Sequence, residues 1–158
     1  MPNGRSQLCG DARAGIANNN AVRCVMEIAG IGRVVFWEGG SLWLALVTGT
    51  MSRHSHHAVQ LCLPLRGTAQ FQTDVGGDWI TCHGALITPD APHAFRAPGE
   101  VVATILFEPE SAVGRTLLAR CTHPGLNLLD AAYTAPLAAP IASAWHQIPR
   151  GSGPSPIA

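Results

Sequence analysis

The amino-acid sequence predicts a mainly β fold, an antiparallel barrel or sandwich followed by short C-terminal helices. About eight short stretches of strand-forming residues, separated by turn residues, follow one another between residues 33 and 107. The segment from Val59 to Leu65 carries apolar residues at every second position, and its other face is partly apolar too, so both faces are expected to be covered. The chain has 158 residues, 47% of them hydrophobic, which suffices for one domain with a core.

The predicted strands are separated by glycine-rich turns at 38–40 and 75–77, as hairpins require. Two hairpins are predicted, one of strands 33–37 and 41–48 and one of strands 68–73 and 78–82. A central extended segment is predicted at 49–67, and two later strands at 93–96 and 101–107.

Helices are predicted after the last of these strands. Ser111 is a suitable N-cap for a helix over 111–121, whose apolar residues fall on one face, and a second short helix is predicted over 126–133. Prolines are expected to interrupt the chain beyond that point: Pro136, Pro140 and Pro149.

This pattern divides the chain into four parts. Residues 1–20 are polar and aperiodic and are predicted to be a flexible arm, and residues 148–158 a disordered tail. Residues 21–121 are predicted to form the barrel with its first helix, with a weak strand or short helix at 22–28. Residues 122–147 are predicted to be a helical extension.

Composition excludes several function classes. Ten basic residues balance ten acidic ones, so no electrostatic attraction to nucleic acid or to a membrane surface is expected. The chain has no lysine, which excludes Schiff-base catalysis by its own residues. Five scattered cysteines without a CxxC pair argue against a disulfide framework, and the N-terminus lacks the apolar core of a signal peptide, so a cytoplasmic location is expected.

The candidate site begins in the segment GTMSRHSHHAVQLCLPLRG, residues 49–67. If this segment is one extended strand, His54, His56 and Gln60 project to the same side. Two imidazoles and a third polar group on one strand face can bind a divalent cation. A second segment, GALITPDAPHAF at residues 84–95, supplies His93 after a proline-containing turn.

Together these two segments resemble the paired motifs of the cupin superfamily, in which an HxH motif and a later histidine converge inside a jelly-roll barrel. The resemblance implies a cupin antiparallel β-barrel with a possible metal site at His54, His56, Gln60 and His93. This chain departs from the pattern at two positions. Gln60 stands where the first motif has a glutamate, which removes a negative ligand, and Ala91 stands where the second motif has a glycine.

Within cupins, the chain is similar to the N-terminal sensor domain of AraC-type transcription regulators over about residues 34–121. The segment FEPESAVGRTLLARC, residues 107–121, adds to this likeness. The resemblance implies effector binding and homodimer formation. It does not extend to the DNA-binding half of such regulators, and no direct DNA binding by this chain is expected. The dimer is expected to use either the apolar face at 59, 61, 63 and 65 or the helix over 111–121.

These observations favour a small-molecule-binding cupin domain with a site that can hold one zinc, nickel or iron ion. Phe95 is expected to line the cup beside Gln60, and Arg53 and Arg96 to contact an anionic ligand at its rim, although either arginine could instead be a solvated surface residue. Two other functions stay open: a stand-alone metal-dependent enzyme, such as an oxygenase, isomerase or cyclase, and an interaction module whose cup is vestigial. A metal-free pocket lined by the same histidines is the alternative to the metal site.

Overall fold

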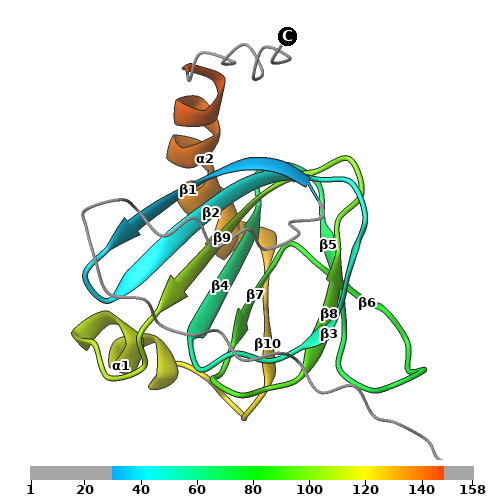
Figure 1. Cartoon of the computed structure of the whole chain (residues 1–158), viewed down its shortest axis with the longest axis vertical. Coiled ribbons are helices and arrows are strands. Elements are labelled where there is room, and N and C mark those ends of the chain that lie inside the picture. The colour runs from blue at the N-terminus through cyan, green and yellow to red at the C-terminus, as the bar shows by residue number, and fades with distance from the viewer. Residues whose placement is uncertain (1–29, 148–158) are drawn as a thin grey trace, which may run out of the picture.

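The computed structural model describes residues 30–147 as two antiparallel β-sheets that face each other, with two helices after the strands (Figure 1). The large sheet has the strand order β1 (Gly30–Trp37), β2 (Gly40–Val47), β9 (Val101–Phe107), β4 (Val59–Pro64), β7 (Gly84–Ile87) and β10 (Leu126–Leu129). The small sheet has the order β3 (Thr50–His54), β8 (His93–Arg96), β5 (Ala69–Gln72) and β6 (Ile80–Cys82). The mainly β, jelly-roll type of fold with C-terminal helices is confirmed.

The first hairpin forms where it is predicted, although β1 starts earlier and Gly40 already belongs to β2. Trp37 pairs with Gly40, and Gly39 closes the turn with a φ of 85°, a left-handed conformation that favours glycine. By contrast, the segment 49–67 is not one strand. β3 ends at His54 and belongs to the small sheet, whereas β4 starts at Val59 and belongs to the large sheet.

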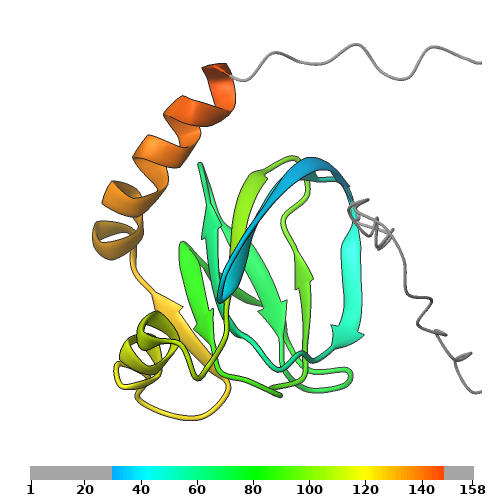
Figure 2. The ribbon, with the colours of Figure 1, turned by 60° about the vertical axis from the view of Figure 1, so that its left-hand side comes forward.

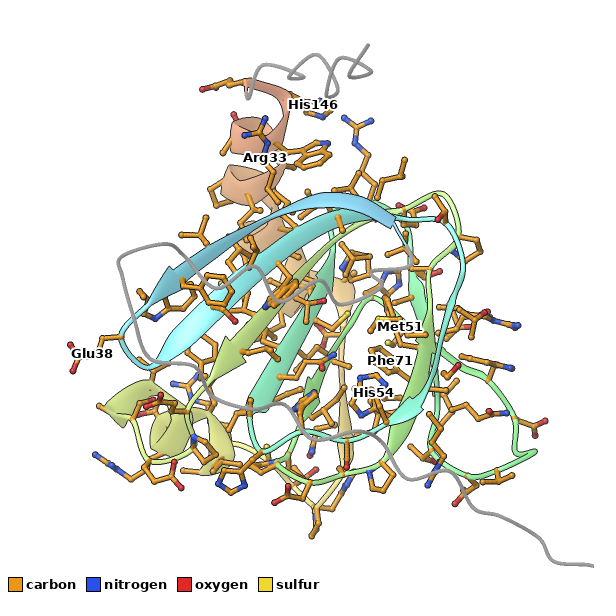
Figure 3. The ribbon with its side chains drawn as sticks, viewed as in Figure 1. Arg33, Glu38, Met51, His54, Phe71 and His146 are labelled. Atoms are coloured by element: carbon orange, nitrogen blue, oxygen red, sulfur yellow. The ribbon has the colours of Figure 1, made fainter. Side chains whose placement is uncertain are left out.

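The main core lies between the two sheets. Alternate residues of each strand point inward, so that Cys62 and Ile87 of the large sheet meet Phe71 and Phe95 of the small sheet. The rings of Phe71 and Phe95 lie 5.2 Å apart, and Phe71 is fully buried. Figure 3 shows Met51, Phe71 and His54 close together on the inner side of the small sheet.

A second core lies on the outer face of the large sheet, where helix α2 (Ala131–Gln147) covers it (Figure 2). Leu63, with an exposed fraction of 1%, packs among Leu61, Leu65, Ile141 and Trp145. Leu61, Leu63 and Leu65 of the predicted apolar face therefore pack in one cluster with Ile141 and Trp145 of α2 in the same chain, and Val59 is buried. The homodimer stays a prediction.

Helix α1 (Ala112–Leu118) forms where the sequence predicts its first helix. The Ser111 hydroxyl accepts a hydrogen bond from the Gly114 N–H at 2.9 Å and donates one to the Glu108 carbonyl at 2.7 Å. Gly114 is needed because a Cβ at this position would lie 2.1 Å from the Glu108 oxygen.

The predicted helix over 126–133 is wrong. Residues 126–129 form β10, with Leu126 opposite Ile87 on the inner face, and α2 begins after Asp130, whose carboxylate accepts the Tyr133 N–H at 2.8 Å. The expectation that prolines interrupt the chain is also wrong at Pro136 and Pro140, which lie inside α2. A proline inside a helix costs about 3 kcal/mol, and the packing of α2 on the large sheet offsets this cost.

The predicted arm, the element at 22–28 and the predicted tail lie outside the described residues. Neither helix of the described part is long and apolar enough to cross a membrane.

Candidate metal centre

Three separate segments bring the histidines of the candidate centre together. His54 is the last residue of β3, His93 is the first residue of β8, and the two are direct partners in the antiparallel pairing of these strands. His56 lies in the loop between β3 and β4, where the chain crosses from the small sheet to the large one. The HxH spacing thus works through a strand end and a loop, and not through one strand face.

One ring nitrogen from each of His54, His56 and His93 lies within 4.8 Å of the others. The ring centroids are 4.5 Å apart for His54 and His93 and 5.4 Å apart for His56 and His93. Metal–nitrogen bonds of about 2.0–2.1 Å require somewhat closer nitrogens, so small side-chain rotations suffice to close the set around an ion.

Backbone carbonyls select the tautomer of all three imidazoles. Nδ1 of His54 lies 2.8 Å from the Ser52 oxygen, Nδ1 of His93 lies 2.9 Å from the Ala91 oxygen, and Nδ1 of His56 lies 3.2 Å from the Ala58 oxygen. A carbonyl can only accept, so each Nδ1 carries the proton and each Nε2 keeps its lone pair. This is the outer-shell arrangement that orients imidazoles toward metals.

His93 is the buried member of the triad. Its side chain has an exposed fraction of 1%, and its Nε2 has no hydrogen-bond partner, the one such buried side-chain atom in the described residues. Burial lowers the pKa of His93 to about 4, so the ring is neutral at physiological pH. A buried acceptor without a partner costs free energy unless something supplies the missing interaction, and a bound cation would do so.

Gln60 approaches the triad from the opposite sheet. Its side chain is 5% exposed, and its Oε1 lies 2.7 Å from Nε2 of His56. If Nδ1 of His56 carries the proton, Nε2 is an acceptor, and the Gln60 amide must turn its NH₂ group toward it to make this hydrogen bond. With an ion present, the opposite amide orientation presents Oε1 as a fourth ligand.

The donor set fits a divalent transition metal. Three neutral imidazoles and an amide oxygen suit zinc, nickel or iron, and the absence of a carboxylate leaves the charge of the ion uncompensated. His54 and His56 are only half-buried, so an ion here would face solvent on one side and keep a position for an exogenous ligand.

The turn that follows β7 holds the loop that carries His56. The Asp90 N–H donates to the His56 carbonyl at 2.9 Å, and the Asp90 carboxylate lies 3.0 Å from Nδ1 of His57. The side-chain hydrogen bond of His57 with Asp90, and a second one of its Nε2 with Glu110 at 3.5 Å, raise the pKa of His57. Asp90 has a φ of 60°, a conformation that aspartate tolerates better than most residues. The sequence indicates the turn at Pro89 and Asp90, but it does not indicate that Asp90 contacts His56 and His57.

The residues that the sequence predicts to contact a ligand do not all lie inside the cup. Phe95 lies inside the cup, 4% exposed, against Phe71. Arg53 donates to the Thr73 carbonyl, and Arg96 lies 4.1 Å from the Trp79 ring and donates to Gln70 at 2.7 Å. Because Phe95 points inward, its neighbour Arg96 lies on the outer face of the small sheet, away from the histidines.

No protein-family model and no curated protein sequence matches this chain. Among solved structures, it is similar to a cupin-2 domain protein from Shewanella frigidimarina, at 20% identity and a TM-score of 0.41, over 49% of this chain and 79% of that one. The cupin_2 domain of an XRE family transcriptional regulator from Enterobacter cloacae is 18% identical, with a TM-score of 0.40, over 52% and 99% of the two chains.

Oxalate decarboxylase of Bacillus subtilis, which has Mn(II) centres, is 15% identical, with a TM-score of 0.41, over 56% of this chain and 28% of its own. The match thus spans little more than a quarter of that enzyme. The fold of this chain, two facing antiparallel sheets, follows from its own strand order. At such low identities, the functions of these proteins are not assigned to this chain.

The stability of the metal-free protein is expected to fall as the pH falls from about 6.5 to about 4. In the unfolded chain the pKa of His93 is about 6.5, whereas in the folded protein it is about 4, so folded His93 stays neutral down to that pH. Between these values the unfolded state binds more protons, so the stabilisation is complete above pH 6.5 and is lost toward pH 4. The expected loss is roughly 3 kcal/mol, measurable as urea-unfolding free energies at several pH values. A His93→Gln variant with the same pH dependence would contradict this assignment.

Proposed function

We propose that this chain is a metal-dependent, small-molecule-binding cupin domain. The ion would be held by His54, His56 and His93, with Gln60 as a fourth ligand or as a hydrogen-bond partner of His56. The observation that carries the proposal is the buried Nε2 of His93, which lacks a partner while three backbone carbonyls orient the imidazoles for coordination. The ion would supply Lewis acidity to a bound oxygen donor.

The inner face of the large sheet supports the binding of a small molecule beside the ion. Gln60 pairs with Leu106, Leu106 with Ser41, and Ser41 with Phe36, so these side chains form a row from the triad to the edge strand β1. Phe36 remains 68% exposed because the four-stranded sheet does not cover this end of the six-stranded one. An apolar or aromatic group of a ligand can pack there.

Effector binding is the role that the AraC-type resemblance implies, and the exposed Phe36 at the end of this row supports it. The second candidate function is that of a stand-alone metal-dependent enzyme. The observation in its favour is the partial exposure of His54 and His56, which would leave the ion accessible to a substrate. The deep part of the cup is filled by Phe71 and Phe95, so in either case the ligand would sit near the histidines and the β1 end.

The proposal is tested by titrating the metal-free protein with Zn²⁺ and with Co²⁺. Calorimetry should report one ion per chain, and the visible spectrum of the cobalt form should indicate nitrogen ligands with a low coordination number. Addition of a small carboxylate should then change the cobalt spectrum, because a coordination position is open. A protein that retains no ion after desalting would contradict the proposal.

A Gln60→Glu variant is expected to bind Zn²⁺ about tenfold more tightly or better, because a negative ligand joins an otherwise neutral set in a mostly buried position. Gln70→Glu is the matched control, since this substitution adds the same charge away from the triad. The Gln70 side chain hydrogen-bonds Arg96 and Thr81 on the small sheet. Calorimetric titration compares the two. Equal affinity in both variants would mean that Gln60 does not face the ion.

A further inference from the structure

A pocket of about 460 Å³ lies on the outer face of the large sheet, away from the histidines. Its floor includes Leu61, Leu86 and Asn127, which are register partners on β4, β7 and β10. Leu117 of α1 and Tyr133 of α2 also line it. Figure 2 shows α1 and the start of α2 flanking β10. Small-molecule sites commonly have volumes of about 300–1,000 Å³.

The floor of this pocket offers no free polar group. Asn127 is 8% exposed, and its side chain is fully used by the preceding loop: Oδ1 accepts the Thr122 N–H at 2.9 Å, and Nδ2 donates to the carbonyls of His123 at 3.0 Å and Gly125 at 3.2 Å. These bonds hold the loop in place. A molecule lying on Leu61 and Leu86 therefore meets an apolar, preformed surface.

The charge at the rim is positive. Arg120 is the one residue of the lining with a permanent charge, and no carboxylate lines the pocket. Among the arginines that the structure describes, Arg120 is also the one whose guanidinium has no partner, whereas Arg53, Arg66, Arg96 and Arg115 each contact a neighbouring group. The nearest acid along the chain after the loop, Asp130, is engaged by the Tyr133 N–H at the start of α2.

We propose that this pocket is a second ligand site, for an anionic amphipathic small molecule such as a medium-chain or aromatic carboxylate. The Arg120 guanidinium binds the carboxylate, and the apolar body of the ligand packs on Leu61, Leu86 and Leu117. The site is independent of the proposed metal centre, because Leu61 and Leu86 point to the face of the sheet opposite to that of their neighbours Gln60 and Ile87.

The test uses the metal-free full-length protein and three probes, measured by titration calorimetry. Octanoate carries both the charge and the apolar body, 1-octanol carries only the body, and acetate carries only the charge. We expect octanoate to bind about tenfold or more tightly than octanol, and acetate to show no saturable binding in the millimolar range. Arg120→Gln should reduce the affinity for octanoate to that for octanol, and Leu117→Ala should weaken both.

Arg115→Gln is the matched control, because Arg115 lies on α1, which ends shortly before Arg120, and contacts the Glu110 carbonyl outside the pocket. It should leave octanoate binding unchanged. The proposal is overturned if octanoate does not saturate the protein below about 10 mM, or if its affinity is the same in Arg120→Gln. Sedimentation velocity tests whether a second copy of the chain occupies the pocket instead. A dimer that does not bind octanoate and that Tyr133→Asp dissociates would assign the pocket to this second copy and would also overturn the proposal.

Discussion

A His54→Ala/His56→Ala double variant is expected to lose binding of Zn²⁺, with the affinity reduced at least about a hundredfold, because two of three imidazoles are removed. Both side chains are half-buried at the solvent side of the cup, so the fold should tolerate the change. Inductively coupled plasma mass spectrometry of the desalted protein measures the retained metal, and circular dichroism checks the fold.

The matched control removes two histidines elsewhere. A His83→Ala/His123→Ala variant changes two exposed residues outside the triad and should retain the ion at one per chain. If the His54/His56 variant retained the same amount of metal as this control, the ion would be bound at another place and the candidate centre would be wrong.

A Phe71→Ala variant is expected to be destabilised by about 3–5 kcal/mol, because a fully buried aromatic ring leaves a cavity at the centre of the main core. The ring of Phe71 lies 6.1 Å from that of His93, so the loss should also loosen the buried ligand and weaken Zn²⁺ binding. Urea unfolding followed by tryptophan fluorescence measures the first effect, and calorimetry the second.

Phe36→Ala is the control for this variant, since it removes the same side chain from a position that is 68% exposed. Its free energy of unfolding should stay within about 0.5 kcal/mol of that of the parent protein. A similar loss in both variants would mean that the two sheets do not enclose Phe71 as described.

The strands could be predicted from sequence because burial on one face imposes a period of two. The hairpin around Gly39, the strand at 93–96 and the strand at 101–107 all occur where the alternation and turns place them. The crossing from β3 to β4 could not be predicted, because 49–67 contains no proline or glycine between His54 and Val59 to mark it. The loop there is imposed by the pairing of His54 with His93 and of Val59 with Phe107 in different sheets.

The two motifs predict that His54, His56 and His93 converge, but the one-strand geometry expected for 49–67 does not explain how. His54 and His56 meet because a strand end and a loop curve around His93, and Gln60 arrives from the opposite sheet. Arg53 and Arg96 adjoin the motifs in sequence, yet Arg53 donates to the Thr73 carbonyl and Arg96 packs against Trp79 on the outer face of the small sheet. Adjacent residues of a strand project to opposite faces, so proximity in sequence to a site residue does not place a side chain in the cup.

The C-terminal helix illustrates the opposite limit. Pro136 and Pro140 predict a break, and local propensity alone would produce one. The residues that decide the outcome are Ile141 and Trp145, which pack against Leu63 and its neighbours, distant in sequence, while Ala138 of the same helix is buried. Tertiary burial of this kind overrides local preference and cannot be read from the helix segment itself.

The most direct test of the metal centre is X-ray absorption spectroscopy of the zinc- or cobalt-loaded protein. We predict three imidazole nitrogens at about 2.0–2.1 Å, with one further oxygen ligand from Gln60 or solvent. The His54→Ala/His56→Ala variant should lose the imidazole scattering together with the ion. A shell of oxygen ligands alone, or of sulfur ligands from the cysteines, would contradict the account.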